Sequence, residues 1–365
     1  LAPYFRKGDN IIAALVWYKG GEDSYSQRTV DHGGLLFQSY LSGAKPEFIL
    51  SDSTWKTTVH PAFGRTEQLK NPSDGSYKWV AWPVSFDAGK EPIDWQKYHY
   101  NDDSWIPAVV KGNPPISPWN NLIHRTIPFW KDHGLAPYLN ESEFPETIAN
   151  DGVVEGMLNS NIQGTPYLKV NAPAGVKIKM VLNDYYYQEY ITKAGVQEFE
   201  CFAWQNSSNH SVKYEFSNVT GPVELLGLKF RETSYNANVI GKFSSDDDAL
   251  NTLWTKCKNT SLVCMRDIYY DCPDRERGQW WGDVSEQILY SFCLYDTMSN
   301  LLSRKAYREL MSCQKPDGSL YTTAPGTVFH LPDQNINAVA MLWEYYLYSG
   351  DKKLLEEIYP QIKKY

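Results

Sequence analysis

Hydrophobic residues follow one spacing up to about residue 240 and another spacing after it. In the first part they occur in short runs bounded by Gly, Pro, Ser or Asp. Apolar and polar residues alternate in Lys177–Val181 and Lys213–Phe216, which is typical of half-buried antiparallel strands. The unbroken apolar run Asn10–Trp17 predicts a buried strand. Short strands at such regular spacing indicate β-sandwiches.

The spacing becomes helical after Phe243. Ser244–Asp248 combines serines with acidic residues, so it predicts a helix start with a Ser N-cap and an acidic first turn. Apolar residues then recur at helical intervals from Leu250 to Cys257. Further helices are predicted over Val284–Met298, Leu301–Cys313, Asn335–Ser349 with Gly350 as C-cap, and Lys352–Lys364. Helices with such short connections are typical of a bundle, a solenoid or an α/α barrel.

Composition narrows the class of protein. The chain has 365 residues, enough for two or three domains, with 42% hydrophobic and 21% charged residues. No run approaches the ~18 apolar residues that a membrane span needs. A net charge of -8 without a basic stripe argues against a nucleic-acid partner.

Aromatic residues are abundant, at 15% of the chain with 13 Trp and 26 Tyr. Sugar rings present apolar C–H faces that stack on aromatic side chains, so the excess favours carbohydrate binding. An aromatic-rich β core explains the same excess equally well. The six cysteines match no zinc or disulfide spacing, and we interpret most of them as buried thiols.

A dense polar run, Asp271–Asp283, separates two apolar segments in the helical part. Its thirteen residues include four carboxylates, two arginines and two tryptophans. Burying so many charges is costly unless each of them is paired. The run is therefore either a salt-bridged loop between helices or a polar site at the mouth of a packed scaffold. His330, the only histidine near it in the helical part, is interpreted as structural.

The residue types in this run suit acid catalysis. Pro273 prevents a helix through Cys272, so we expect Asp271 at a chain reversal. Arg275 and Arg277 flank Glu276 and can hold its carboxyl group by charge-assisted hydrogen bonds.

The second half of the run adds apolar surface and a helix start. Trp280 and Trp281 supply an apolar wall, and a carboxyl group against such a wall is desolvated. Desolvation raises its pKa and suits it to act as a general acid near neutral pH. Gly282 permits a close backbone approach, and Asp283 can serve as N-cap of the following helix.

The motif itself is specific. Asp-Cys-Pro-x-Arg-Glu-Arg followed by Trp-x-Gly-Asp resembles the signature of the α-L-rhamnosidases of glycoside hydrolase family 78. Relatives often carry Leu-Gly before the Trp, where this chain has Gly278-Gln279, but the residue count is kept. The resemblance spans nearly the whole chain, with further similar segments at Ser85–Glu91, Asp103–Trp105, Arg125–Pro128, Tyr190–Glu200, Leu228–Thr233, Phe243–Ser245, Met265–Asp267 and Leu342–Asp351.

This resemblance implies a multidomain β + α fold, with antiparallel β-sandwich domains followed by part of an (α/α)6 six-hairpin barrel. The expected divisions are residues 1–145 (an N-terminal jelly-roll-like β-sandwich with an accessory segment), 146–240 (a second β-sandwich) and 241–365 (the first part of the catalytic barrel). A closed barrel of twelve helices needs roughly 300 residues. We therefore expect the chain to be a fragment of a longer protein.

The resemblance also implies an inverting hydrolase that releases terminal α-L-rhamnose from oligosaccharides or glycosides. Glu276 is implied as the general acid, and the implied substrate-binding residues are Asp271, Arg275, Trp280 and Asp283. An inverting pair needs a second carboxylate about 6.5–9.5 Å away. In the family this base is a later Glu, expected here beyond Tyr365, so we expect the 365 residues alone to be inactive. Neither step requires a metal or another cofactor.

Two other functions stay open at this point. One is a six-hairpin glycosidase with another sugar specificity, and the other is a non-catalytic glycan-binding protein on the same scaffold. The intact Asp271, Glu276 and Asp283 argue against the second. Asp333 and Gln334 either line the same pocket or cap a helix, and capping is the preferred interpretation. The sequence shows neither the oligomeric state nor the compartment.

Overall fold

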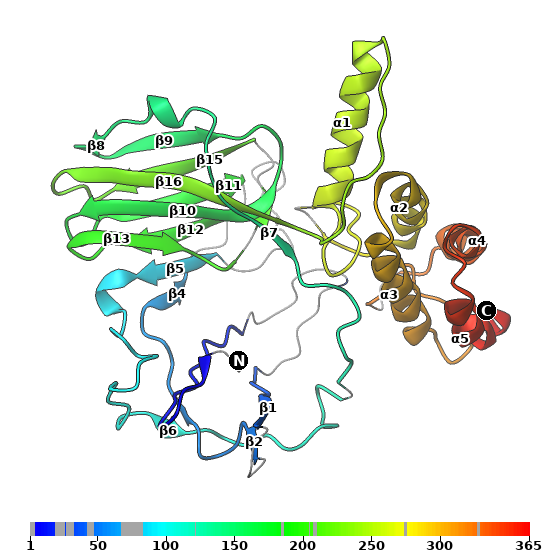
Figure 1. Cartoon of the computed structure of the whole chain (residues 1–365), viewed down its shortest axis with the longest axis horizontal. Helices are drawn as coiled ribbons and strands as arrows, with labels where there is room; N and C mark the ends of the chain where they lie inside the picture. The colour runs from blue at the N-terminus through cyan, green and yellow to red at the C-terminus, as the bar shows by residue number, and fades with distance from the viewer. Residues whose placement is uncertain are drawn as a thin grey trace.

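The computed structural model describes residues 4–18, 26, 33–41, 47–66, 83–120, 122–183, 186–203, 205–206, 210–273, 276–326 and 329–365. Strands dominate the chain up to residue 234, and five helices follow (Figure 1). Among the described residues, no helix is both long and apolar enough to cross a membrane.

Two six-stranded sheets form a β-sandwich. The first has the order β13-β10-β16-β7, with β14 paired to β10 and β8 paired to β16; the second has the order β4-β5-β12-β11-β15-β9. All pairs are antiparallel except β5 with β12. The strands of the first sheet are β7 (Lys131–Pro137), β8 (Thr147–Ile148), β10 (Gln163–Ala172), β13 (Gly195–Glu200), β14 (Gln205–Asn206) and β16 (Val223–Ser234). Those of the second are β4 (Phe63–Arg65), β5 (Val84–Asp87), β9 (Gly152–Met157), β11 (Lys177–Asn183), β12 (Tyr186–Ile191) and β15 (Ser211–Ser217).

The sandwich core lies between the two sheets. Ile178 and Met180 of β11 are fully buried, as is Leu168 of β10, while the lysines that alternate with them on β11 are part-exposed. The predicted alternation is thus confirmed at Lys177–Val181, and β15 shows it again. The burial of every second residue reflects the two-residue period of a strand.

The first predicted domain shares its strands with the second. β5 and β7 lie before residue 145 and pair with strands that lie after it, and β4 joins the same sheet by pairing with β5. The remaining strands form two small ladders, β1 (Gln38–Leu41) with β2 (Glu47–Leu50) and β3 (Lys56–Thr57) with β6 (Ile106–Pro107). Short 3-10 turns occur at Ala88–Lys90 and Glu141–Glu143. The domain divisions at residues 145 and 240 stay a prediction.

The strand predicted at Asn10–Trp17 is wrong. This segment is irregular and largely exposed, and it pairs with no described strand. Its apolar residues find other contacts, since the ring of Trp17 packs edge-on against Phe202 at 4.8 Å. An apolar run indicates that its side chains make contacts in the folded protein, but it does not specify a strand. Here Trp17 contacts Phe202 without any strand pairing.

The helices are α1 (Asp248–Val263), α2 (Trp281–Leu294), α3 (Met298–Ser312), α4 (Pro332–Ser349) and α5 (Lys352–Lys364). α1 begins one turn later than its predicted Ser N-cap. Asp247 is the N-cap, and its carboxylate accepts from the Ala249 N–H. The predicted C-cap Gly350 is confirmed, with a left-handed φ of 66° that glycine adopts at low cost.

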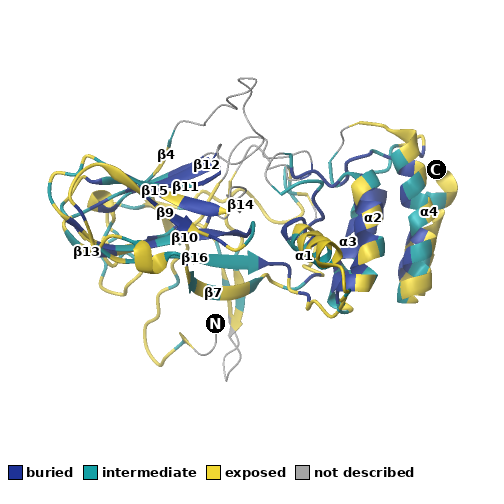
Figure 2. Ribbon diagram, turned by 90° about the horizontal axis from the view of Figure 1, so that it is seen from above, coloured by how far each residue is buried: buried dark blue, intermediate teal, exposed yellow. Residues whose placement is uncertain are grey.

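A second core lies among α2 to α5. Trp281 and Ile288 of α2, Tyr307 of α3 and Tyr345 of α4 are almost completely buried there. Figure 2 shows the buried faces of α2 and α3 turned toward their neighbours, with the exposed faces turned outward. This packing holds the start of α2, and with it the polar run Asp271–Asp283, at one end of the helical part.

Candidate active site

The polar run forms a closed loop before α2. The Asp271 N–H donates to the Gly278 carbonyl at 3.0 Å, and the Gly278 N–H donates to Asp271 Oδ1 at 2.8 Å. Asp271 therefore lies at a chain reversal, as predicted. Arg277 donates its Nε to the Pro273 carbonyl at 2.9 Å and has a left-handed φ of 45°, which non-glycine residues rarely adopt. Asp274 and Arg275, the latter a predicted binding residue, lie outside the described residues.

Asp271 and Glu276 form a carboxyl pair. One side-chain oxygen from each and the Cys272 sulfur all lie within 4.8 Å of one another. Burial raises the pKa of Asp271 to about 7, and the hydrogen bond and negative charge of Glu276 add to this shift. Hydrogen bonds from Cys272 and the Gly278 N–H oppose it. Because Asp271 is largely buried beside a second carboxyl group, it keeps its proton to a higher pH than an ordinary aspartic acid does.

The same three side chains are the one group among the described residues that is close enough to hold a metal ion. Asp271 Oδ1 already accepts the Gly278 N–H, and burial raises the pKa of the Cys272 thiol. A protonated thiol is a poor ligand because metals bind the thiolate. The arrangement suits proton storage better than metal binding.

Trp280 and Phe329 form an aromatic wall at this end of the helices. Trp280 is the N-cap residue of α2 and pairs through its backbone with Thr323. Its ring stacks on Phe329 with centroids 5.2 Å apart, and Phe329 is 49% exposed. Trp281, predicted to share this wall, is instead fully buried against Tyr307. The two neighbouring tryptophans at the start of α2 thus point in different directions: Trp280 stays partly exposed, whereas Trp281 enters the core.

Phe329 was missed by sequence reasoning. It follows Trp280 by 49 positions, in a loop before α4, and belongs to no motif. Its φ of 59° is left-handed, which no sequence pattern marks for a phenylalanine. In the sequence, only the general excess of aromatic residues hinted at an aromatic contact such as the one Phe329 makes.

Asp283 is exposed in the first turn of α2, and the prediction that it caps this helix is wrong. Partial burial raises its pKa, and the negative charge of Glu276 raises it further, so the two carboxyl groups interact through space. The cap comes from α4 instead, where Gln334 Oε1 accepts from the Gly282 N–H at 3.1 Å. A Cβ on Gly282 would lie 2.9 Å from Gln334 Cδ, so the predicted close approach is confirmed. Asp333 is exposed.

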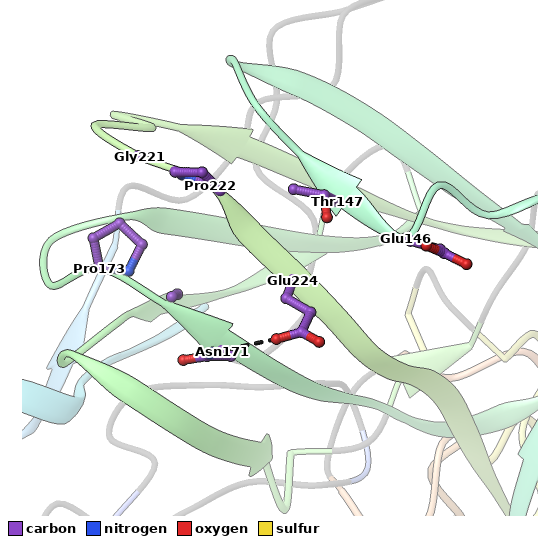
Figure 3. Close-up of a pocket in the computed structure, with 8 residues that line it drawn as sticks. Glu146, Thr147, Asn171, Pro173, Gly221, Pro222 and Glu224 are labelled. Carbon is purple, nitrogen blue, oxygen red and sulfur yellow. Dashed lines mark hydrogen bonds between the residues drawn. The ribbon is translucent and has the colours of Figure 1, made fainter.

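His330 has a structural environment, as expected. Its Nδ1 lies 2.9 Å from the Leu320 carbonyl and 3.3 Å from Asn335 Nδ2. A separate open groove of about 540 Å³ lies on the β-sandwich (Figure 3). It is lined by acidic, amide and proline side chains, with Asn171 Nδ2 donating to Glu224 Oε2 at 3.2 Å. None of the predicted site residues lines it.

The helical part of the chain is similar to the six-hairpin glycosidases. Residues 238–365 match the family described as bacterial alpha-L-rhamnosidase 6 hairpin glycosidase domain. An alpha-L-rhamnosidase of Formosa agariphila is 24% identical over 90% of this chain and 35% of its own length. The chain thus spans about a third of the length of this curated relative.

Solved structures agree on the fold. The alpha-L-rhamnosidase from Dictyoglumus thermophilum has a TM-score of 0.67 at 20% identity, over 92% of this chain and 38% of that one. The Streptomyces avermitilis alpha-L-rhamnosidase complexed with L-rhamnose has a TM-score of 0.67 at 19% identity, over 92% and 32%. The predicted resemblance to family 78 rhamnosidases and the predicted fold class are confirmed. The roles of the individual site residues stay a prediction.

Proposed function

We propose that the full-length protein hydrolyses terminal α-L-rhamnosides with inversion, with Glu276 as the general acid. The observation that carries this proposal is the Asp271–Glu276 carboxyl pair. The pair contains a group that titrates near neutral pH, because burial and the neighbouring Glu276 raise the pKa of Asp271 to about 7, and acid catalysis near neutral pH needs such a group at the site. The names of the relatives support rhamnose as the sugar.

In the proposed reaction Glu276 protonates the glycosidic oxygen while the bond from that oxygen to the anomeric carbon breaks. A water molecule attacks the anomeric carbon from the opposite face and gives its proton to a carboxylate base. The products are free rhamnose with inverted configuration and the leaving alcohol. Such a base stands about 6.5–9.5 Å from the acid, to leave room for the water. Asp271 is closer than this to Glu276, so we do not assign it as the base.

Asp271 has a different role in this proposal. Burial, together with the hydrogen bond and negative charge of Glu276, raises the pKa of its carboxyl group to about 7, and its Oδ1 accepts from the Gly278 N–H. The same carboxyl group can accept a hydrogen bond from a sugar hydroxyl. Arg275 and Asp283 are proposed to bind other hydroxyl groups of the ring.

Trp280 is proposed to face the apolar side of the sugar. Rhamnose is a 6-deoxy sugar, and its methyl group and ring C–H groups present an apolar edge. The stack of Trp280 on Phe329 holds the indole in place and enlarges the apolar wall. Aromatic faces and C–H groups attract each other through dispersion and the ring quadrupole.

A six-hairpin glycosidase for another sugar is the alternative enzyme, and a non-catalytic glycan-binding protein is the alternative outside enzymes. A panel of chromogenic α-glycosides separates them when the full-length protein is assayed beside Glu276→Gln. We expect cleavage of the rhamnoside, reduced roughly 10²–10⁴-fold in the variant because general acids contribute about that much. Equal rates for variant and wild type would remove Glu276 from its role. Cleavage of a different glycoside would favour a six-hairpin glycosidase for another sugar. Binding without cleavage would favour a non-catalytic glycan-binding protein.

A further inference from the structure

The segment that delivers Asp271 is a tight hairpin. Between α1 and the polar loop, Met265 and Tyr269 form an antiparallel bridge. The Tyr270 N–H donates to the Cys264 carbonyl at 2.8 Å, and the Arg266 N–H donates to the Ile268 carbonyl at 3.0 Å. The base of this hairpin continues directly into Asp271, and Arg266 and Asp267 lie near its tip. Any movement of the tip therefore reaches the carboxyl pair through a short, hydrogen-bonded backbone.

Arg266 extends from the tip into the β-sandwich and is fully buried. Its Nη1 donates to Gln163 Oε1 of β10 at 2.7 Å and to the Thr233 carbonyl of β16 at 3.1 Å. Its Nη2 donates to Thr233 Oγ1 at 2.6 Å, and the guanidinium lies over the Trp130 ring at 3.9 Å. Figures 1 and 2 show β16 running toward the base of α1.

Asp267, the next residue, is held from two other sides. Its carboxylate pairs with Arg125 at 2.8 Å, and Arg125 precedes β7 in the chain. Its carbonyl accepts from Lys305 Nζ of α3 at 2.8 Å. The hairpin tip is thus fixed by the sandwich, by the segment before β7 and by the helical core at once.

The contact through Lys305 leads back to the polar run. Lys305 also pairs with Glu309, whose second oxygen accepts from Gln279 Nε2 at 3.2 Å. Gln279 is fully buried, and its Oε1 accepts from the Tyr269 N–H of the hairpin at 3.1 Å. Gln279 directly precedes Trp280. One connected set of hydrogen bonds therefore ties the sandwich, the hairpin, α3 and the aromatic wall together.

We propose that Arg266 is a positioning residue, and that the β-sandwich sets the geometry of the Asp271–Glu276 pair through it. In this view the sandwich is part of the catalytic unit and not a separable binding module. The expected effect of Arg266 on the reaction rate rests on the proposed function. Buried hydrogen bonds to a charged group are strong and directional. A misplacement of about 1 Å in a catalytic group costs about 10²-fold in rate, so loosening the tip lowers kcat more than it weakens substrate binding.

Thr233→Val in the full-length enzyme tests the proposal, because it removes the 2.6 Å acceptor and keeps the shape of the side chain. Thr165→Val is the matched control: Thr165 is on the same sheet, and its hydroxyl donates to Glu200 at 2.6 Å, away from the hairpin. We expect kcat to fall about tenfold in Thr233→Val with KM nearly unchanged, and to stay at the wild-type value in Thr165→Val. Equal kcat values in the two variants would overturn the proposal.

Arg266→Lys adds a second measurement. A lysine keeps the positive charge but cannot make the forked contacts to Gln163 and Thr233, so kcat should fall here as well. An Arg266→Lys enzyme with a wild-type kcat and pH profile would contradict the positioning role. If this variant does not fold, Thr233→Val still decides the question.

Hydrogen exchange separates a failure of this proposal from a failure of the proposed function. The backbone amides of residues 264–271 should exchange faster in Thr233→Val than in Thr165→Val, whether or not the protein cleaves rhamnosides. A wild-type protein without rhamnosidase activity would end the functional proposal but leave this comparison intact. Equal exchange in both variants would show that the sandwich does not hold the hairpin.

Discussion

The carboxyl groups of Asp271 and Glu276 lie within 4.8 Å of each other, separated by only four residues of a closed loop. This spacing is shorter than the about 6.5–9.5 Å between the acid and base of an inverting glycosidase. We therefore propose that the two carboxyl groups lie on the same side of the sugar and do not form an acid–base pair across it. Burial raises the pKa of Asp271 to about 7, and the hydrogen bond and negative charge of the nearby Glu276 add to this shift.

Asp271→Asn is expected to change the pH dependence of the enzyme. The variant removes the carboxyl group whose pKa is raised to about 7, and with it the proton that this group carries below that pH. The high-pH limb of the kcat profile should therefore move to lower pH, with a loss in kcat because a sugar contact is also removed. A pH series with a chromogenic rhamnoside measures both effects. Glu286→Gln, on an exposed position of α2, is the control, and an unchanged limb in Asp271→Asn would show that Asp271 does not set it.

The same group should make stability depend on pH. The pKa of Asp271 is raised from an ordinary value of 3.8 to about 7, so the folded state binds this proton more tightly than the unfolded state. Its ionisation on raising the pH from about 4 to about 7 therefore costs stability, and below pH 4 the cost disappears. Asp271→Asn should raise the Tm relative to wild type by about 2–4 °C at pH 8 and by less at pH 5. Thermal unfolding at the two pH values checks this, and an equal difference at both would refute it.

Gly282 should be intolerant of even a small side chain. A Cβ there would meet Gln334 at 2.9 Å, and the flexible end of Gln334 would have to move away from the Gly282 N–H that it caps. Gly282→Ala should therefore lower the free energy of unfolding by about 1 kcal/mol, the usual value of one hydrogen bond or helix cap. Gly227→Ala in β16 is the control because nothing lies within 4 Å of its added Cβ. In a Gln334→Ala background, Gly282→Ala should cost much less, and full additivity would rule out this mechanism.

Features that depend on neighbouring residues could be predicted from the sequence, whereas features that depend on distant residues could not. The alternation in β11 and the C-cap Gly350 follow from a few neighbouring residues, and both are confirmed. The direction of Trp281, in contrast, depends on the core that α3 and α4 complete. The cap of α2 is supplied by Gln334, which lies 52 positions after Gly282, so the local rule wrongly favoured Asp283.

The motif predicted which residues come together at the site, but not the contacts that hold them in place. Asp271 and Glu276 come together because they share one loop, and their spacing in the sequence contains this information. The anchoring of Arg266 in the sandwich joins residues 103 positions apart, and no periodicity or motif marks such a contact. The contact between Phe329 and Trp280 likewise joins residues far apart in the sequence, and no motif marks it. Tertiary packing decides these features, so the structure was needed to find them.

Phe329 should contribute to substrate binding through its stack with Trp280. It is half exposed, so Phe329→Ala removes little core packing but leaves the indole of Trp280 less firmly held. An aromatic contact of this kind contributes about 0.5–1.5 kcal/mol, which predicts a rise in KM of about 2- to 12-fold for a rhamnoside with a smaller change in kcat. Phe243→Ala is the matched control, because Phe243 is also about half exposed and packs on another tryptophan, Trp254, at 5.6 Å. Steady-state kinetics of both variants decide the matter: if KM changes equally in the two, the loss reflects general destabilisation, and the aromatic wall has no part in binding the sugar.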